Sequence, residues 1–208
     1  MRAAFIAIAV LAAAPLTAAA VQQGGAPSVP GKPDPSLAAA GTYTVDSGHS
    51  QVLFTVNHLG FSEYTGQFTN PTGTLTLDPA NPSASKVEVT FPIDKVSTTV
   101  PALDAHLKKP EFFDAAKFPT ATFVSTRVEA SGTTARITGN LTIKGITKPV
   151  VLDAKFVGAG KAVMGPPKTN VGFSATTTVK RSDFGVNYGI PMVSDDVRLV
   201  INAAFVAQ

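Results

Sequence analysis

Apolar and polar residues alternate along most of the chain after residue 41, which is the pattern of β-strands with one buried face. Val52, Phe54, Val56 and His58 would share one face of such a strand. The same period of two recurs in residues 87–93, 137–143, 150–156, 171–179 and 197–205, with shorter candidates at 42–45, 74–77 and 122–128. Gly, Pro, Asn and Asp residues separate these runs. The pattern therefore predicts eight or nine strands in an antiparallel sheet and an all-β fold.

One segment departs from the strand period. In residues 100–118, Leu103, His106 and Leu107 fall at helical spacing. Pro101 suits the first turn of a helix, and Pro110 would end it. A second short turn is predicted over residues 111–116. We expect a short helical insert in an otherwise antiparallel sheet.

A sheet of this length would close as a barrel or pack as a sandwich. An eight-stranded barrel leaves an interior that side chains can fill or that can hold one slender ligand. The predicted inward positions mix large residues with small ones: Phe54, Phe91, Phe156, Phe173 and Phe205 with Gly139, Ala154, Ala175 and Ala203. The large side chains could fill the space opposite the small ones, so the alternation leaves both a packed core and a tunnel open.

The N-terminus has a different composition. Residues 1–20 have one charge, Arg2, then an apolar run, Pro15 and a stretch of small residues, the order of a secretory signal peptide. The apolar run is shorter than the ~20 residues of a membrane span. Residues 21–40, rich in Pro and Gly, are predicted to form a flexible leader outside the fold. We expect an exported protein, periplasmic or secreted, with no stable membrane span and one barrel domain over residues 41–208.

Composition narrows the function. The chain lacks Cys, which excludes a disulfide framework, a cysteine nucleophile and a thiolate metal site. A net charge of +3 without a basic run does not indicate a nucleic-acid partner. His49, His58 and His106 do not have metal-ligand spacing, and no catalytic motif is complete, so we expect no metal, no cofactor and no catalytic residue.

Polar residues at strand ends are the candidates for ligand contact. His58 continues an inward apolar stripe and could meet a ligand head group at the end of a cavity. Arg181 follows the predicted strand 171–179 and could pair with an anionic head group or, equally, with Asp183 or another carboxylate. Aromatic residues and lysines in the helical insert could cover a barrel mouth.

The order of motifs resembles the YceI family of exported bacterial proteins, often called polyisoprenoid-binding proteins. The resemblance rests on YTVD (43–46) with His49-Ser50, FTVNH (54–58), GQF (66–68), DAHL (104–107), EFFD (111–114), FPTATF (118–123), GNLTIKGITKPV (139–150) and RSDFG (181–185). These motifs extend in family order across about 165 residues. The resemblance implies an extended lipocalin-like barrel with an elongated apolar channel. It also implies a long isoprenoid ligand, such as a polyprenyl chain or a quinone tail.

Under this implication, residues of this chain can be placed along a channel. Phe54, Val56 and Phe91 would form the wall and Phe112 and Phe113 the mouth, while His58, His106 and Arg181 would be polar contacts. The expected function is an isoprenoid carrier. Two alternatives remain: an enzyme using His58, His106 and Asp104, and a filled barrel that acts as a stress-related partner protein. A homodimer is compatible with an open-edged barrel, although no residue pattern fixes an interface.

Overall fold

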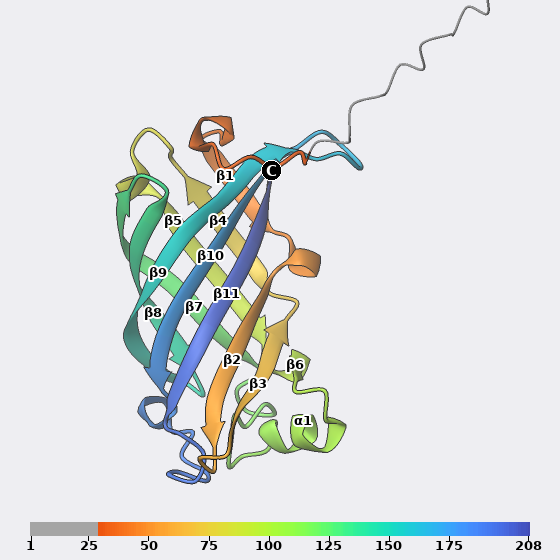
Figure 1. Ribbon diagram of the computed structural model, residues 1–208, viewed down its shortest axis with the longest axis vertical. Coiled ribbons are helices and arrows are strands. Elements are labelled where there is room, and N and C mark those ends of the chain that lie inside the picture. The colour runs from red at the N-terminus through yellow and green to blue at the C-terminus, as the bar shows by residue number, and fades with distance from the viewer. Residues whose placement is uncertain (1–28) are drawn as a thin grey trace, which may run out of the picture.

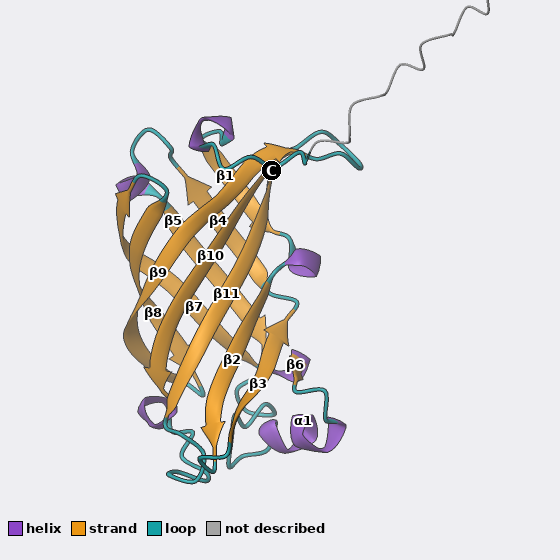
Figure 2. Cartoon of the chain, in the orientation of Figure 1, coloured by secondary structure: helices purple, strands orange, loops and turns teal. Residues whose placement is uncertain are grey.

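The computed structural model describes residues 29–208 and contains a closed antiparallel β-barrel with one short α-helix (Figures 1 and 2). The strands are β1 (Gly41–Val45), β2 (Gln51–His58), β3 (Ser62–Thr69), β4 (Thr72–Leu77), β5 (Lys86–Pro92), β6 (Val96–Ser97), β7 (Thr120–Ser131), β8 (Thr134–Ile143), β9 (Ile146–Lys161), β10 (Thr169–Lys180) and β11 (Asp196–Ala207). Helix α1 spans Pro101–Leu107, and short 3-10 turns lie at Pro35–Leu37, Ser47–His49, Pro82–Ala84, Ile93–Lys95 and Arg181–Phe184. The all-β prediction with a helical insert is confirmed.

The barrel closes through eight strands in the order β1-β4-β5-β7-β8-β9-β10-β11, because β11 also pairs with β1. β11 continues past β1, and its first half pairs with β2 from Arg198 opposite Thr55 to Asn202 opposite Gln51. β2, β3 and β6 therefore lengthen the wall below β1 and β4 (Figure 1). The barrel is extended rather than compact.

Three wall strands are interrupted where this extension begins. β1 and β2 are separated by residues 46–50, β3 and β4 by 70–71, and β5 and β6 by 93–95. The Ser47 hydroxyl joins two of these breaks by donating to the Pro71 carbonyl at 2.6 Å. Counted as bent strands, these pairs account for the expected eight or nine, although residues 62–69 were not predicted as a strand.

The buried hydrophobic core cluster lies at the end of the barrel near the C-terminus. It contains Tyr43, Val45, Leu75, Ala159, Val171 and Phe205. Tyr43 is 1% exposed and donates from its hydroxyl to the Ala39 carbonyl at 2.7 Å, and burial raises the pKa of this phenol. This cluster closes one end of the barrel interior.

The expected leader differs from the structure where it meets the barrel. Lys32 forms a bridge with Ala159 of β9 through two backbone hydrogen bonds of 2.9 Å. Glycines make this approach possible, since a Cβ at Gly158 or Gly160 would meet the backbone of Lys32 or Pro30. The last residues of the Pro-rich segment are therefore attached to the fold despite their prolines. The predicted signal peptide, residues 1–20, lies outside the described residues.

Candidate functional site: an apolar cavity in the barrel

The barrel interior contains a cavity of about 610 Å³, within the roughly 300–1,000 Å³ common for ligand sites. Along β11 it is lined from Val197 to Phe205, which corresponds to about 26 Å of strand at the usual rise per residue. Its wall consists mainly of Val, Leu, Ile and Phe side chains from nearly every strand. The site is long, narrow and apolar.

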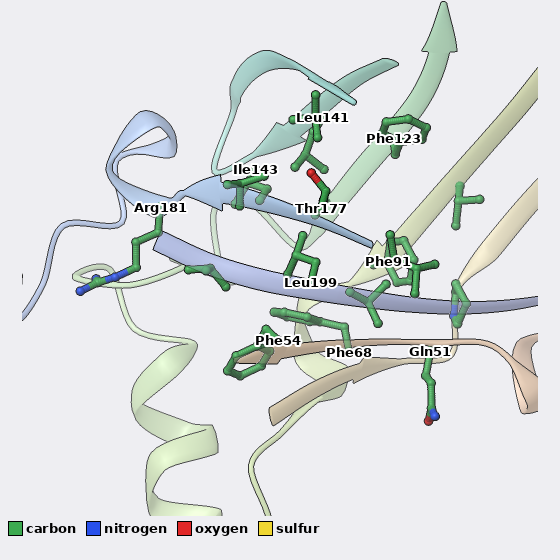
Figure 3. A pocket seen from close by; sticks show the side chains of 18 of the residues that line it. Gln51, Phe54, Phe68, Phe91, Phe123, Leu141, Ile143, Thr177, Arg181 and Leu199 are labelled. Atoms are coloured by element: carbon green, nitrogen blue, oxygen red, sulfur yellow. The ribbon is translucent and has the colours of Figure 1, made fainter. Parts of the chain in front are cut away.

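Inward residues in the lower barrel remain partly exposed because they face this cavity instead of one another. Phe54, Phe91, Leu199 and Ile201 all line it and are only half-buried. Figure 3 shows Phe54, Phe68 and Leu199 on neighbouring strands, with Leu141 and Ile143 across the interior. The Phe54 and Phe68 rings lie 5.6 Å apart between centroids. Of the two interiors that the alternation left open, a packed core and a tunnel, the structure combines parts of both: an apolar cavity occupies most of the barrel, and the buried cluster around Tyr43 closes one end of it.

Glycines determine where two wall rings lie. A Cβ at Gly66 would overlap the ring of Phe54, and one at Gly139 would overlap the ring of Phe123. Gly66 stands opposite Phe54 in the β2–β3 pair, so the ring lies flat over bare backbone. These contacts keep two large side chains against the wall and leave the axis open.

Gly66→Ala is expected to push the Phe54 ring into the cavity. The barrel should lose roughly 1–3 kcal/mol of unfolding free energy from this overpacking, and the cavity should narrow. Gly172→Ala is the matched control, because a Cβ there has its nearest neighbour at 3.8 Å and a strand-compatible backbone. Urea unfolding measures both variants, and equal stability for the two would contradict this role of Gly66.

All eight sequence-predicted contact residues line the cavity: Phe54, Val56, His58, Phe91, His106, Phe112, Phe113 and Arg181. Phe54, Val56 and Phe91 lie in the strand wall. Phe112 and Phe113 follow α1 at the open end, where the Phe113 ring packs edge-on against Phe68 with centroids 5.4 Å apart.

An aromatic cluster stands at the mouth of the cavity. The His106 ring meets Phe112 at 4.9 Å and Tyr188 at 5.4 Å between centroids, both nearly edge-on. His106 Nε2 lies 3.0 Å from a carboxylate oxygen of Glu111, which contributes to lowering the pKa of that carboxyl after its own backbone hydrogen bond. His58 lies at the exposed end of β2, 6.2 Å from the Tyr64 ring. The two histidines are at the same end of the cavity but have different partners.

Of the two partners considered for Arg181, a head group and a carboxylate, the structure bears only on the carboxylate, and it shows backbone carbonyls in that place. The Arg181 guanidinium donates to four backbone carbonyls at 2.8–2.9 Å, those of Val186, Tyr188, Val193 and Ser194. The side chain is buried, and neither Asp183 nor another carboxylate of the described residues accepts a hydrogen bond from it. Burial lowers the pKa of Arg181, and the charge of Asp195 partly offsets this. Since a guanidinium has five N–H groups, one remains beyond these four bonds.

Asp195 also holds this loop. It accepts from the Ser182 N–H at 2.8 Å and from the Ser182 hydroxyl at 2.7 Å, and these bonds lower its pKa below the usual 3.8. Because the pKa of Asp195 is lower in the folded state than in the unfolded state, its ionised carboxylate adds to the free energy of unfolding at pH values above the unfolded-state pKa. This stabilisation is therefore present at neutral pH and is lost as the pH falls through the folded-state pKa.

The three residues of the enzyme alternative, His58, His106 and Asp104, are not joined by hydrogen bonds into one site. Asp104 accepts from the N–H and hydroxyl of Thr98 at 2.6 and 2.7 Å and contacts neither histidine. Within residues 29–208, no three His, Asp or Glu side chains gather as a metal site would require. In the same range, no helix has the length and hydropathy needed to cross a bilayer.

Sequence reasoning missed Phe68 and Tyr188 as lining residues. Phe68 lies on β3, where Tyr64, Gly66 and Phe68 do alternate, but the glycine interrupts the apolar signal. Tyr188 lies in the loop before β11, where its spacing of two from Ile190 and Met192 was the only signal in the sequence, although this segment forms no strand.

Comparisons with known proteins agree with this architecture. The YceI-like domain model matches residues 43–205. A UPF0312 protein of Pseudomonas aeruginosa is 39% identical over 173 residues, covering 82% of this chain and 90% of the relative. Protein YceI of Salmonella heidelberg is 42% identical over the same length and coverage.

Solved structures are similar as well. The Campylobacter jejuni YCEI protein has a TM-score of 0.65 and 34% identity, covering 73% of this chain and 90% of its own. A polyisoprenoid binding domain from Saccharophagus degradans has a TM-score of 0.61 at 13% identity, which shows the fold alone, and covers 80% of this chain and 98% of its own. The domain match and these relatives show that the chain belongs to the YceI family.

Proposed function

We propose that this protein binds one long isoprenoid chain, a polyprenyl lipid or a quinone tail, inside the barrel and carries it through water. The observation that carries the proposal is the unfilled apolar cavity, which follows β11 from Val197 to Phe205 and is blind at the Tyr43 end. A slender, flexible hydrocarbon fits this shape better than a compact polar substrate does.

The energetics favour such a ligand. A polyprenyl chain exposes several hundred square ångströms of apolar surface in water, and its burial is worth roughly 10 kcal/mol before ordering costs. The wall offers few polar partners along its length, so contacts would depend on the shape and apolar character of the chain. The polar groups His58, His106 and Tyr188 lie at the mouth, where a head group would remain near water.

The family and fold support this proposal. The Saccharophagus degradans neighbour is described as a polyisoprenoid binding domain. The N-terminal sequence pattern supports export, and we propose that the mature protein acts in the periplasm or outside the cell.

Titration with a fluorescent polyprenyl analogue tests the proposal. We expect saturable binding of one chain per barrel, with displacement by an unlabelled polyprenyl lipid. A compact polar molecule of similar mass should not compete. The absence of saturable binding by folded protein would contradict the proposal.

His58→Ala and His106→Ala are each expected to weaken binding about two- to tenfold, because each removes one contact at the mouth and no wall surface. His49→Ala is the control, since His49 is exposed and pairs with Asp46 outside the cavity. The affinity of each variant is measured in the same titration. Unchanged affinity in both mouth variants would contradict their placement at the head group. Loss of a chemical turnover by orders of magnitude would favour the enzyme alternative.

A further inference from the structure

Large apolar side chains are exposed on the loops that surround the cavity mouth. The β2–β3 turn carries Leu59 and Phe61, and the loop before β11 carries Tyr188, Ile190 and Met192. Phe61 is 89% exposed and Met192 62%. We call these five residues the mouth rim. An exposed apolar cluster of this kind on a water-soluble barrel commonly marks an interaction surface.

The two loops of the mouth rim form one continuous structure. The Leu59 N–H donates to the Met192 carbonyl at 2.7 Å, and His58 forms a bridge with Val193. In Figure 1 these loops are the tips that project furthest at the lower end of the barrel. Arg181 holds one of the two loops of the mouth rim through its hydrogen bonds to the Tyr188 and Val193 carbonyls.

The rim is continuous with the cavity. Tyr188 lines the cavity and also belongs to the rim, where it is 54% exposed. Because the Tyr43 cluster closes the other end, an apolar ligand reaches the wall through this mouth. A long isoprenoid is nearly insoluble in water and resides in a bilayer, so its transfer requires the mouth to meet a lipid surface.

Lysines stand beside the mouth. Lys108 and Lys109 follow α1, and Lys144 donates to the Pro110 carbonyl at 2.8 Å, which places its amine next to the same segment. Glu111, the adjacent carboxylate, is paired with His106. Glu63 and Asp114 are at the same end, so insertion of apolar side chains should dominate and the preference for anionic lipid should be modest.

We propose that the mouth rim is a docking surface for a lipid bilayer, into which Phe61, Ile190 and Met192 insert while the lysines contact head groups. This inference rests on the proposed function, because an isoprenoid cargo is what makes a bilayer the partner. Docking would bring the cavity mouth to the plane of the membrane, so that a chain passes from bilayer to barrel with little exposure to water.

Vesicle flotation with matched variants tests this surface. The rim variant is Phe61→Ser with Met192→Ser. The control is Val163→Ser with Met164→Ser in the β9–β10 loop, where the two side chains are 76% and 84% exposed at the opposite end of the barrel. The probes are vesicles of phosphatidylcholine alone and of phosphatidylcholine mixed with phosphatidylglycerol.

We expect wild type and control to float with vesicles equally. The rim variant should bind vesicles at least about tenfold more weakly than wild type. Lys108→Gln with Lys109→Gln should reduce only the gain from phosphatidylglycerol, by roughly fivefold per lysine at most. Equal flotation of the rim variant and the control, or no flotation of wild type, would overturn the docking surface. A wild-type dimer that the rim variant converts to monomer, without vesicle binding, would assign the rim to a second copy instead.

A second readout separates docking from cargo. Uptake of a short, water-soluble prenyl alcohol does not require a bilayer, so the rim variant should take it up as wild type does. Wild type that takes up the alcohol but does not float would overturn docking alone. Rim-dependent flotation without uptake of the alcohol would support docking and contradict the proposed cargo.

Discussion

Leu199→Glu is expected to lower affinity for an isoprenoid chain about a hundredfold or more, a larger effect on binding than that of either histidine change at the mouth. Leu199 lines the middle of the cavity on β11, opposite Phe54 of β2. In the empty barrel a carboxylate there can be hydrated. A bound chain would displace that water and leave the charge against hydrocarbon, so the cost falls mainly on the complex.

Val200→Glu is the matched control for this change. Val200 is the next residue of the same strand and does not line the cavity, since neighbouring residues of a strand face opposite sides of the sheet. It should leave affinity within a few-fold of wild type. Circular dichroism checks that both variants are folded, and Leu199→Gln, a neutral change, should have an intermediate affinity. Equal binding by the two glutamate variants would contradict an internal binding site.

Arg181→Ala is expected to cost roughly 3–5 kcal/mol of unfolding free energy, the largest effect on stability. The change removes four charge-assisted hydrogen bonds to carbonyls of the 186–194 segment, several of which would lose their partner beneath the loop. Because the same segment carries Tyr188, the mouth should also become more mobile.

Arg198→Ala is the control, since Arg198 is an exposed residue of β11 and such substitutions usually change stability by about 0.5 kcal/mol or less. Arg181→Lys should recover only part of the loss, because an ammonium cannot reach the four carbonyls with the geometry of a planar fork. Urea unfolding gives the free energies, and hydrogen exchange of residues 186–194 reports on the loop. A stable Arg181→Ala protein with a protected loop would contradict this role.

The strand pattern of this chain could be predicted because antiparallel strands with one buried face alternate in sequence. The inward stripe Val52, Phe54, Val56 in β2 was found in this way, and it lines the cavity as expected. The breaks at residues 46–50, 70–71 and 93–95 were not predicted as one feature, since each is a local turn and only the pairing of strands places them at the same level.

The state of the barrel interior could not be predicted from alternation. Inward residues alternate in the same way whether their side chains meet or leave a space between them. The deciding contacts are tertiary, such as the Phe54 ring over Gly66 and the Phe123 ring over Gly139. Arg181 illustrates the same limit, because its partners are backbone carbonyls that have no sequence signature.

Isoprenoid binding inside the barrel is tested by native mass spectrometry of the protein purified from the cell that produces it, followed by organic extraction of any bound molecule. If the cavity holds an isoprenoid, the spectrum shows one added mass per chain that fragments in isoprene units, and this mass is lost in Leu199→Glu but not in Val200→Glu. A bare mass, with no uptake when a polyprenyl lipid or quinone is added, would mean that the barrel does not carry isoprenoids.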